Sequence, residues 1–433
     1  MGRAADEQFV LFREPRGAHD HDLALVPLEV VDRFLNGAPV GDFNADLVPG
    51  REPVGGLLVV PEPSAAPHPA LAVAVGDHPQ PGTGSLGAAD ALGLAVQQVR
   101  PDHEVWVLLS GGTTSLIGAP TAGITPGDLT TLYRLLLGSG LDITAMNRIR
   151  KRFARWAGGR LAAALHPAHV KNFTISDVIG DDLGSIGSGP CVPDASSAAE
   201  VREALGSAGL WDQLPAPLRQ HLAAVMRGEL PETPKPDAPA FATSRTTLFA
   251  SNHLALEAAG RRAEARGFEA RLLDAALAGE AADVGRRLGA GMLAYDATNV
   301  AGAQVGRVNK DTVLVWGGET TVTLSPDAGL GGRSQELALA AAGALVTAEP
   351  ARRPAITLLA AGTDGRDGPT DAAGGFADGG TWSRIRAAGR DPAADLARHA
   401  SNAALAAAGD LFQTGMTGTN VMDLVLGFLP RTG

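Results

Sequence analysis

The chain has 433 residues, which is too long for one ordinary domain and predicts two or three. Hydrophobic residues make up 45% of it and charged residues 19%, the balance of a globular rather than a disordered protein. The formal net charge of −11 argues against a general nucleic-acid-binding surface, so an anionic ligand would need a local basic pocket.

Cysteine and the N-terminal sequence indicate the compartment. Cys191 is the one cysteine, so no disulfide can form within the chain, and a reducing environment is expected. The first 17 residues contain no long apolar segment, and no later stretch has the roughly 18 uninterrupted apolar residues of a membrane span. We therefore expect a cytoplasmic protein without membrane partners, and the sequence is compatible with a homodimer.

Short apolar runs alternate with longer amphipathic ones from about residue 56. The amphipathic segments predict helices at 85–100, 253–267 and 334–346. The apolar runs are continuous rather than alternating, which is typical of strands covered on both faces in a mainly parallel sheet with helices on both sides. These predicted strands lie at 56–62, 104–110, 171–177, 246–251, 312–318 and 355–362.

A proline-rich stretch suggests the domain boundary. Residues 228–244 contain four prolines and several charges, so they predict neither helix nor central strand, and we interpret them as a linker. The expected organisation is α/β: a Rossmann-like N-terminal domain over 1–240 and a second α/β domain over 241–433. Pro, Gly and Asp interrupt every apolar run in residues 1–55, which receive no assignment.

Four predicted strands run into loops of the same composition, rich in Gly and Thr with Asp or Glu. Beyond the carboxyl ends of strands is where open α/β sheets bind ligands, so we expect these loops to line one crevice or two facing ones. Each loop alone is explained equally well as a turn or a helix N-cap, and the repetition is what favours a site for phosphate and Mg²⁺. The loops are 110–115, 177–182, 317–321 and 363–368.

Basic residues gather in residues 147–160. On a helix, Arg148, Arg152 and Arg155 share one face, which we expect to be solvated. We expect anion binding instead from Arg150, Lys151 and Arg160. Arg333 is a second candidate, because it follows two glycines at a predicted helix start and its guanidinium could hold a carboxylate or phosphate bidentately.

Several standard motifs are absent or incomplete. The sequence has no GxxxxGK[ST] phosphate loop, no GxSxG elbow, and no zinc-type spacing among His166, His169 and His253. A GxGxxG string occurs at Gly82–Gly87, but two prolines separate it from the apolar run at 71–76. This spoils the tight strand-to-helix turn that a dinucleotide site needs.

Seven motifs together resemble the glycerate 2-kinase family, and they occur in the family's order over about residues 55–430. The family joins an N-terminal α/β domain to a C-terminal domain called MOFRL. The resemblance implies ATP- and Mg²⁺-dependent phosphorylation of D-glycerate at its 2-hydroxyl, with the active site in the interdomain cleft. The motifs are SGGTTSLIGAP (110–120), NRIRKRFARWAGGRLAAA (147–164), ISDVIGDDLGSIGSGPCVPD (175–194), GGETTVTL (317–324), GGRSQELAL (331–339), AAGTDGRDGPTDAAGGFADG (360–379) and TGTNVMDL (417–424).

Two features depart from the family pattern. The family's loop SGGGSAL has Thr113 and Thr114 here in place of Gly and Ser. The family also carries a GxGKA motif near its N-terminus, whose lysine is thought to act in catalysis, whereas no lysine precedes Lys151 in this chain. Lys151 is the preferred substitute, ahead of Arg51.

The roles of the site residues are expected as follows. Asp177 is the metal ligand or base, with Asp181 as a second metal ligand; Arg333 meets the developing charge, and Lys151 the acceptor carboxylate. Which carboxylate is base and which is metal ligand stays open. ATP is assigned to Ser110, Gly111, Gly112, Thr113, Thr114, Ser115, Gly318, Glu319 and Asp364, and the hydroxy acid to Arg150, Arg160, Ser188 and Asp371.

Two other functions remain open at this point. One is an NAD(P)H-dependent hydroxypyruvate reductase that uses Gly82–Gly87. The other is a relative that binds a nucleotide or metabolite without catalysis, suggested by the missing N-terminal lysine.

Overall fold

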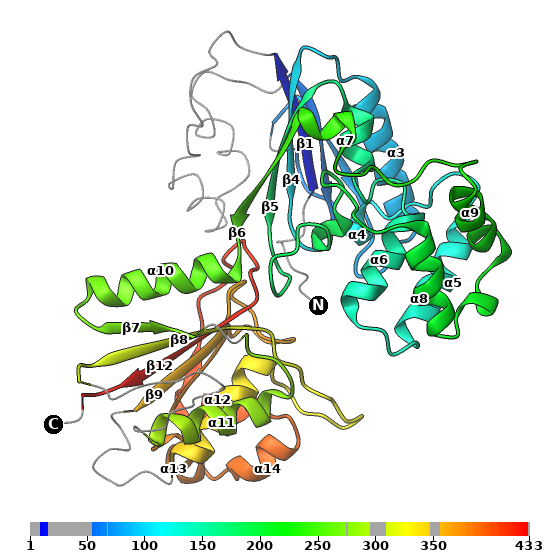
Figure 1. The fold of residues 1–433 in the computed structure, drawn as a ribbon. Coiled ribbons are helices and arrows are strands. Elements are labelled where there is room, and N and C mark those ends of the chain that lie inside the picture. The colour runs from blue at the N-terminus through cyan, green and yellow to red at the C-terminus, as the bar shows by residue number, and fades with distance from the viewer. Residues whose placement is uncertain are drawn as a thin grey trace. The chain divides into compact units, whose positions relative to one another are not determined.

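The structure is a computed structural model that describes residues 9–15, 54–66, 68–273, 276–294, 309–346 and 356–431. Its described residues form two compact units, and the chain passes from one to the other between Phe249 and Ala250. Each unit has one six-stranded sheet (Figure 1). No helix in these residues has both the length and the apolar character needed to span a membrane.

The N-terminal unit is built on a sheet with strand order β3-β2-β1-β4-β5-β6. The pairs β2–β3 and β4–β5 are parallel, and β1 runs antiparallel between β2 and β4. Because β1 is antiparallel to both β2 and β4, these two strands are parallel to each other. The four strands β2, β3, β4 and β5 therefore all point the same way. The strands are β1 (Phe9–Pro15), β2 (Gly55–Val60), β3 (Leu71–Val75), β4 (His103–Leu109), β5 (His169–Ile175) and β6 (Ser244–Ala250).

Burial on both faces explains the continuous apolar runs of this sheet. Leu57 and Val59 pack in one core with the helices α3 (Thr83–Gln97) and α7 (Arg160–Leu165), while Leu58 and Val60 are buried on the opposite face. A strand that alternates between two buried faces needs an apolar side chain at every position. The predicted strand at 56–62 and helix at 85–100 are therefore confirmed.

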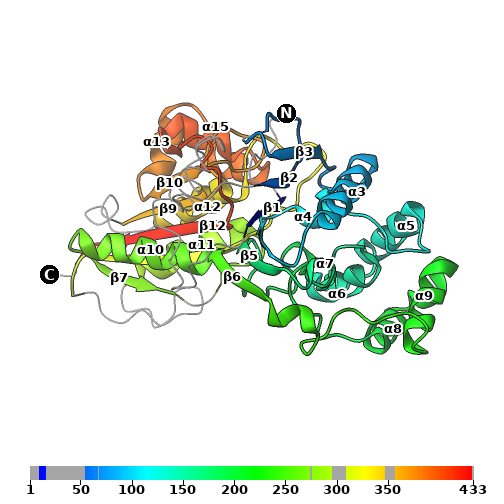
Figure 2. The ribbon, with the colours of Figure 1, turned by 90° about the horizontal axis from the view of Figure 1, so that it is seen from above.

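Four helices of this unit form a separate core beside the sheet. Figures 1 and 2 show them grouped together, and their apolar faces share one cluster that includes Leu132, Phe153, Val201 and Leu222. The short α4 (Thr113–Leu116) and the 3₁₀ turns η2 (Ile186–Ser188) and η4 (Pro239–Ala242) lie elsewhere in the unit. The four helices are α5 (Pro126–Leu137), α6 (Ile143–Phe153), α8 (Ala198–Ser207) and α9 (Ala216–Met226).

The C-terminal unit has a mixed sheet with strand order β11-β10-β9-β12-β8-β7. The pair β7–β8 is parallel, whereas β10 and β12 run antiparallel to every neighbour they have. β8 and β9 coincide with predicted strands, and β10 and β12 were not predicted. The strands are β7 (Glu269–Leu272), β8 (Thr312–Gly318), β9 (Thr357–Gly362), β10 (Gly374–Asp378), β11 (Leu411–Phe412) and β12 (Asp423–Leu429).

Helices cover both faces of this second sheet. Figure 1 shows α10 on one face and α11 and α12 on the other. Trp316 and Leu358 lie in the core beneath α11 and α12, together with Val425 of β12. α10 and α12 confirm two predicted helices. The helices are α10 (Asn252–Ala265), α11 (Ala281–Leu293), α12 (Arg333–Leu345), α13 (Thr381–Ala387), α14 (Pro392–Ala397) and α15 (Ser401–Ala408).

The proline-rich stretch 228–244 is not a linker, contrary to its interpretation from sequence. It lies within the N-terminal unit, where Glu232 pairs with Arg152 of α6 and Thr233 donates a hydrogen bond to Asp194 over 2.9 Å. Prolines exclude helix and central strand but do not prevent an extended segment from packing on its own domain.

Candidate functional site

Three loops of the N-terminal unit come together at one edge of its sheet. They follow β3, β4 and β5, which point the same way, so their carboxyl ends meet there. Ser115 Oγ donates to the main-chain oxygen of Pro79 at 2.7 Å, and Thr114 Oγ1 lies 3.0 Å from Ser188 Oγ. The predicted loop 110–115 therefore contacts both the loop after β3 and the segment after β5 that contains Ser188.

The Asp177 side chain lies directly against the glycine at the end of β4. A Cβ on Gly111 would collide with Asp177 Oδ2. Gly112, next in the chain, has φ of 75°, a left-handed conformation that favours glycine, and α4 starts immediately after it. The Asp177 carboxylate thus lies against Gly111, two residues before α4 begins.

The loop that follows β5 has two non-glycine residues in left-handed conformations. Asp181 has φ of 54° and Ser188 φ of 64°. Between them, Asp182 accepts hydrogen bonds from the main-chain N–H of Gly184 and the hydroxyl of Ser185, which fixes the turn. Such positions cost free energy and cluster at functional sites, so their presence beside Asp177 supports a ligand site here.

Lys151 reaches this same loop from α6. Its ammonium donates to the main-chain oxygen of Gly184 at 3.0 Å, and only 8% of the residue is exposed. Burial lowers the pKa of Lys151, and the carboxylates of Asp194 and Asp182 partly offset this by favouring the charged form. The structure therefore brings Lys151 together with the loop of Asp177.

Arg150 and Arg160 are engaged elsewhere. The Arg160 guanidinium donates to four main-chain oxygens at the end of α6, those of residues 151, 152, 154 and 157. A helix end leaves carbonyls unpaired, so these bonds account for Arg160 as a cap on α6. The Arg150 guanidinium lies over the Tyr133 ring, 4.9 Å from its centroid. Their predicted contacts with substrate stay predictions.

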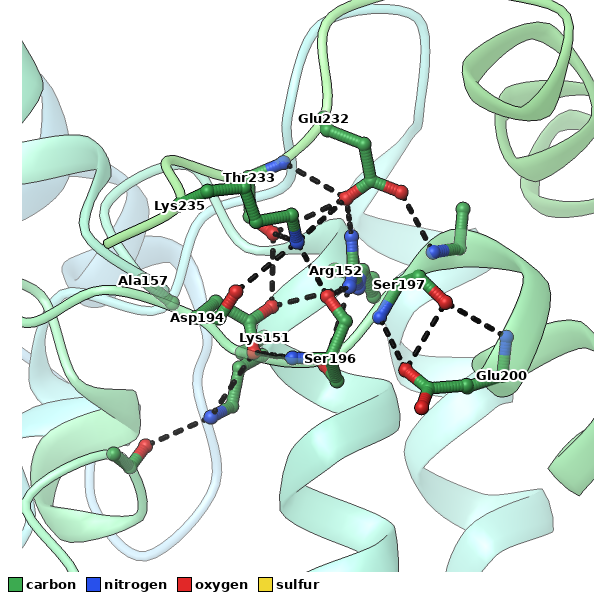
Figure 3. Close-up of polar contacts among 12 residues, drawn as sticks. Lys151, Arg152, Ala157, Asp194, Ser196, Ser197, Glu200, Glu232, Thr233 and Lys235 are labelled. Atoms are coloured by element: carbon green, nitrogen blue, oxygen red, sulfur yellow. Dashed lines mark hydrogen bonds and ion pairs between the residues drawn. The ribbon is translucent and has the colours of Figure 1, made fainter. Parts of the chain in front are cut away.

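Arg152 is not on a solvated face, contrary to the sequence prediction. Only 3% of it is exposed, and it pairs with Asp194 and Glu232, as Figure 3 shows. Its face of α6 is covered because the stretch 228–244 folds back over it and supplies Glu232. Arg148 is exposed as expected, and Arg155 is partly exposed and pairs with Asp90 at 2.7 Å.

The C-terminal unit places Arg333 between two carboxylates. Arg333 is the first residue of α12, and its Nε and Nη2 donate to the two oxygens of Asp423 at 2.7 and 2.9 Å. Nη1 lies 2.7 Å from Oε1 of the exposed Glu319. Burial disfavours the charged guanidinium, but the two carboxylates outweigh it and raise the pKa of Arg333.

Asp423 was not among the predicted site residues, although the quoted motif 417–424 contains it. It is the first residue of β12, which pairs it with Gly318 of β8 and Gly362 of β9. That pairing brings it between the loops after β8 and β9. Acidic site residues were predicted only in loops that follow the ends of strands. Asp423 lies at the start of a strand, and it reaches the same edge because β12 runs antiparallel to β8 and β9.

Gly332, the residue before Arg333, leaves room for a carboxylate of the protein itself. A Cβ on Gly332 would collide with the carboxylate of Asp367, which accepts hydrogen bonds from the N–H groups of Ser334 and Gln335. Asp367 therefore caps α12 and occupies the position that a phosphate would take at this helix start. Any anion that Arg333 binds would therefore contact its guanidinium rather than the first N–H groups of α12.

Three further residues of this unit were predicted to belong to the site: Asp364, Gly318 and Asp371. Asp364 Oδ1 accepts from the N–H of Arg366 at 2.9 Å, and burial raises the pKa of Asp364. Gly318 has φ of 139° and packs against Leu277. Asp371 is exposed and accepts a hydrogen bond from Gln413 at 3.2 Å.

The chain resembles known proteins over most of its length. A family model described as a domain of unknown function (DUF4147) matches residues 42–223, and the MOFRL family matches residues 312–423. The glycerate 2-kinase of Pyrococcus horikoshii is 38% identical over 351 residues, which are 81% of this chain and 76% of the relative. The chain belongs to the glycerate 2-kinase family.

Solved and named relatives of this family extend the comparison. The crystal structure of glycerate kinase from Thermotoga maritima has a TM-score of 0.75 at 33% identity and covers 86% of this chain and 84% of that chain. A protein of Agrobacterium vitis named as a candidate hydroxypyruvate reductase is 37% identical over 86% of this chain and 80% of its own. The predicted family and two-domain α/β fold are confirmed.

In this family member the GxGxxG string does not form a free phosphate site. The carboxylate of Asp77 lies against Gly82 and Gly84, and Oδ2 accepts a hydrogen bond from the N–H of Ser85 at 3.0 Å. A dinucleotide's pyrophosphate binds at such a helix start. Here a carboxylate of the chain itself occupies that place.

The donor set of the kinase site suits Mg²⁺ bound together with phosphate. No group of three or more His, Cys, Asp or Glu side chains within the described ranges is arranged to hold a metal ion alone. Mg²⁺ usually takes one or two carboxylates and completes its shell with water and substrate phosphate. Asp177 and Asp181, in one loop, offer the one or two carboxylates that this mode needs.

Proposed function

We propose that the chain transfers the γ-phosphoryl group of ATP to the 2-hydroxyl of D-glycerate or of a related small hydroxy acid. The similarity to glycerate 2-kinase across 81% of this chain supports the reaction class. The geometry then suggests which residues act, because a loop with Gly-Gly, a carboxylate and a buried ammonium lie at one sheet edge.

Contacts with the ATP phosphates are assigned to the start of α4. The hydroxyls of Thr113, Thr114 and Ser115 bond to Ser110 O, Ser188 Oγ and Pro79 O. Since these side chains are engaged within the protein, phosphate contact falls to main-chain N–H groups at Gly112 and after it. This is how the loop accommodates threonine where the family has glycine and serine.

Asp177 is assigned the chemistry at the acceptor. The hydroxyl oxygen of the hydroxy acid forms a bond to the γ-phosphorus, and the bond from that phosphorus to the bridging oxygen of ADP breaks. The hydroxyl proton passes to a carboxylate, and Asp177 is the candidate because it lies on the glycine loop. Mg²⁺, when bound, neutralises charge on the phosphate oxygens.

Two cations complete the assignment. Lys151 is assigned to the anionic groups of the substrates at the loop after β5. Arg333 is assigned to the charge that develops on the transferred group. Its Nε and Nη2 are held by buried Asp423, while Nη1 pairs with exposed Glu319, a weak contact that Nη1 can exchange for a phosphoryl oxygen.

The test is a coupled assay of ADP release with glycerate, tartronate and erythronate, each with and without Mg²⁺. Turnover that needs both Mg²⁺ and a hydroxy acid is expected. Proton-coupled phosphorus NMR of the glycerate product then identifies the oxygen, because a phosphate on the 2-hydroxyl couples to one CH proton and gives a doublet. ATP binding without turnover on any of these acids would favour a binding protein instead.

Hydroxypyruvate reduction is the second candidate, favoured by the name of the Agrobacterium vitis relative. The carboxylate of Asp77 at the start of α3 opposes it, since the pyrophosphate of NAD(P)H would meet a like charge there. Loss of NADH absorbance with hydroxypyruvate measures this activity directly, and none is expected.

A further inference from the structure

A network of five charged side chains, three of them buried and two partly exposed, lies at one end of α6 (Figure 3). Lys151 and Arg152 come from α6 itself, Asp194 from the loop after η2, and Glu232 and Lys235 from the stretch 228–244. Three cations face two carboxylates, so one positive charge is left over within the network. The question is which cation keeps it.

Arg152 and Lys235 are each bound to carboxylate and main-chain oxygens. Arg152 pairs with Glu232, lies 3.3 Å from Asp194 Oδ2 and donates to the main-chain oxygen of Ser196. The Lys235 ammonium donates to the main-chain oxygen of Asp194 at 3.0 Å and lies 3.1 Å from Glu232 Oε2. These two cations and Glu232 hold the network together from one side.

Lys151 is bound differently. Its ammonium has three N–H donors, and among the described residues it makes one hydrogen bond, to the main-chain oxygen of Gly184. Asp194 Oδ1 lies 3.8 Å away, near enough to attract the charge and too far for a hydrogen bond. Of the three cations in this network, Lys151 is therefore the one with the fewest hydrogen bonds to it, and it lies beside the loop that contains Asp177.

Asp194 is fixed at both oxygens. Oδ1 accepts from the N–H and the hydroxyl of Ser196 at 3.1 and 2.8 Å, and Oδ2 accepts from the Thr233 hydroxyl at 2.9 Å. Burial alone would raise the pKa of Asp194, but these bonds with the charges of Arg152 and Lys151 outweigh it and lower that pKa. A rigid, ionised carboxylate thus lies behind the ammonium.

We propose that Asp194 is a positioning residue for phosphoryl transfer, which keeps the Lys151 ammonium charged and directed at the loop after β5. This inference rests on the proposed function, in which Lys151 meets the substrate. Four charged groups act on Lys151: Asp194 and Asp182 favour the ammonium, and Arg152 and Arg148 oppose it. Of the two carboxylates, Asp194 has the larger effect on the pKa of Lys151. Removing Asp194 should therefore lower that pKa more than removing Asp182.

The decisive variant is Asp194→Asn, measured by the pH dependence of kcat. Without the carboxylate, burial and Arg152 act on Lys151 unopposed by Asp194, so Lys151 loses its proton at lower pH. The alkaline limb of the profile should move down by about one pH unit or more, with a lower kcat at neutral pH. An alkaline limb that coincides with that of the wild type would overturn the proposal.

Glu232→Gln is the matched control. Glu232 belongs to the same network, pairs with Arg152 and Lys235, and makes no recorded ion pair with Lys151. This variant should lower the melting temperature but leave the alkaline limb in place. If both variants shift the limb equally, the effect is general loosening of the network and Asp194 has no special role.

A measurement without catalysis separates this inference from the proposed function. The chain has four lysines, so the pH dependence of competitive amine labelling at Lys151 can be followed in one peptide. Asp194→Asn should lower the labelling pKa of Lys151 and leave that of exposed Lys310 unchanged. An unchanged labelling pKa overturns the positioning role, whereas absent turnover in the wild type overturns only the kinase function.

A second variant covers the case in which Asp194→Asn does not fold. Asp194→Glu keeps the charge and displaces it by one methylene group. The proposal expects the labelling pKa of Lys151 to stay near that of the wild type while kcat falls several-fold. Full activity in a folded Asp194→Glu protein would show that the placement of this carboxylate does not matter.

Discussion

Arg333 is held by two carboxylates that differ in burial, and the role proposed for this residue depends on that difference. Asp423 is 6% exposed and binds two of the guanidinium donors, whereas Glu319 is exposed and binds one. An exposed ion pair contributes little to stability, so exchanging Glu319 for a phosphoryl oxygen costs little. In the proposed mechanism, Asp423 keeps the guanidinium oriented while Nη1 exchanges Glu319 for a phosphoryl oxygen.

We expect Arg333→Ala to reduce ADP release by about 100-fold or more, as for loss of a transition-state cation. Initial rates at saturating ATP and hydroxy acid measure this. Arg384→Ala is the control, because Arg384 also lies between two acids, Asp378 and Asp410, away from the predicted loops. Near-normal turnover in a folded Arg333→Ala protein would remove Arg333 from the mechanism.

Asp177→Asn should abolish activity with almost no change in melting temperature. The side chain is half-buried at the end of β5, and asparagine keeps its shape while losing the charge needed to accept a proton or bind Mg²⁺. ADP release and thermal unfolding are measured on the same preparation. A large fall in melting temperature with activity retained per folded molecule would make Asp177 a structural residue.

At the scale of elements, the sequence predicted those strands that carry a continuous run of apolar or β-branched residues. β2, β4, β5, β6, β8 and β9 all coincide with predicted apolar runs. β10 and β12 were not predicted because glycine interrupts both, as at Gly375 and Gly427, where neighbouring side chains leave no space for a Cβ. β8 also contains closely packed glycines and was still predicted, because the uninterrupted run 312–316 precedes Gly317 and Gly318.

The candidate site was predicted only where one loop carries its own chemistry. The loops 110–115 and 177–182 could be proposed from the sequence because Gly, Ser, Thr and Asp follow a predicted strand in each. Asp194, Glu232 and Asp423 pair with residues that lie 43, 80 and 90 positions away in the chain, namely Lys151, Arg152 and Arg333. Such pairs depend on how segments fold back on one another, and spacing in one sequence does not reveal that.

The stretch 228–244 should make stability depend on pH through Glu232. Burial would raise the pKa of Glu232, but hydrogen bonds from the N–H of Ala198 and from Arg152 and Lys235 lower it to about 2. A depressed folded-state pKa stabilises the protein above the unfolded-state value and loses this as pH falls. Wild-type stability in urea should therefore decline from about pH 4.3 toward pH 2.

Glu232→Gln should flatten that decline in the same window, since glutamine does not titrate. Glu203→Gln, at an exposed position of α8, is the control and should keep the wild-type slope. Identical slopes for wild type and Glu232→Gln would show that the stretch 228–244 is not held by this charge.

At the scale of the whole molecule, lysine is scarce, and this limits which lysine side chains could contact the transferred phosphoryl group. Against a net charge of −11, the chain has four lysines, none before residue 151. Arg152 and Arg160 are committed to carboxylates and to the end of α6. Of the basic residues in 147–160, Lys151 is the one that reaches the loop of Asp177.

An active kinase without the family's N-terminal lysine must obtain that cation elsewhere, because uncompensated charge on the transferring group would cost several kcal/mol of barrier. Lys151→Met should therefore suppress ADP release far more than Arg51→Met, a control at a position outside the described residues. Methionine keeps the length and apolar character of the lysine stem, so both proteins should fold, which thermal unfolding checks. Equal losses in the two variants, or a larger loss for Arg51→Met, would transfer the role from Lys151 to the N-terminal segment.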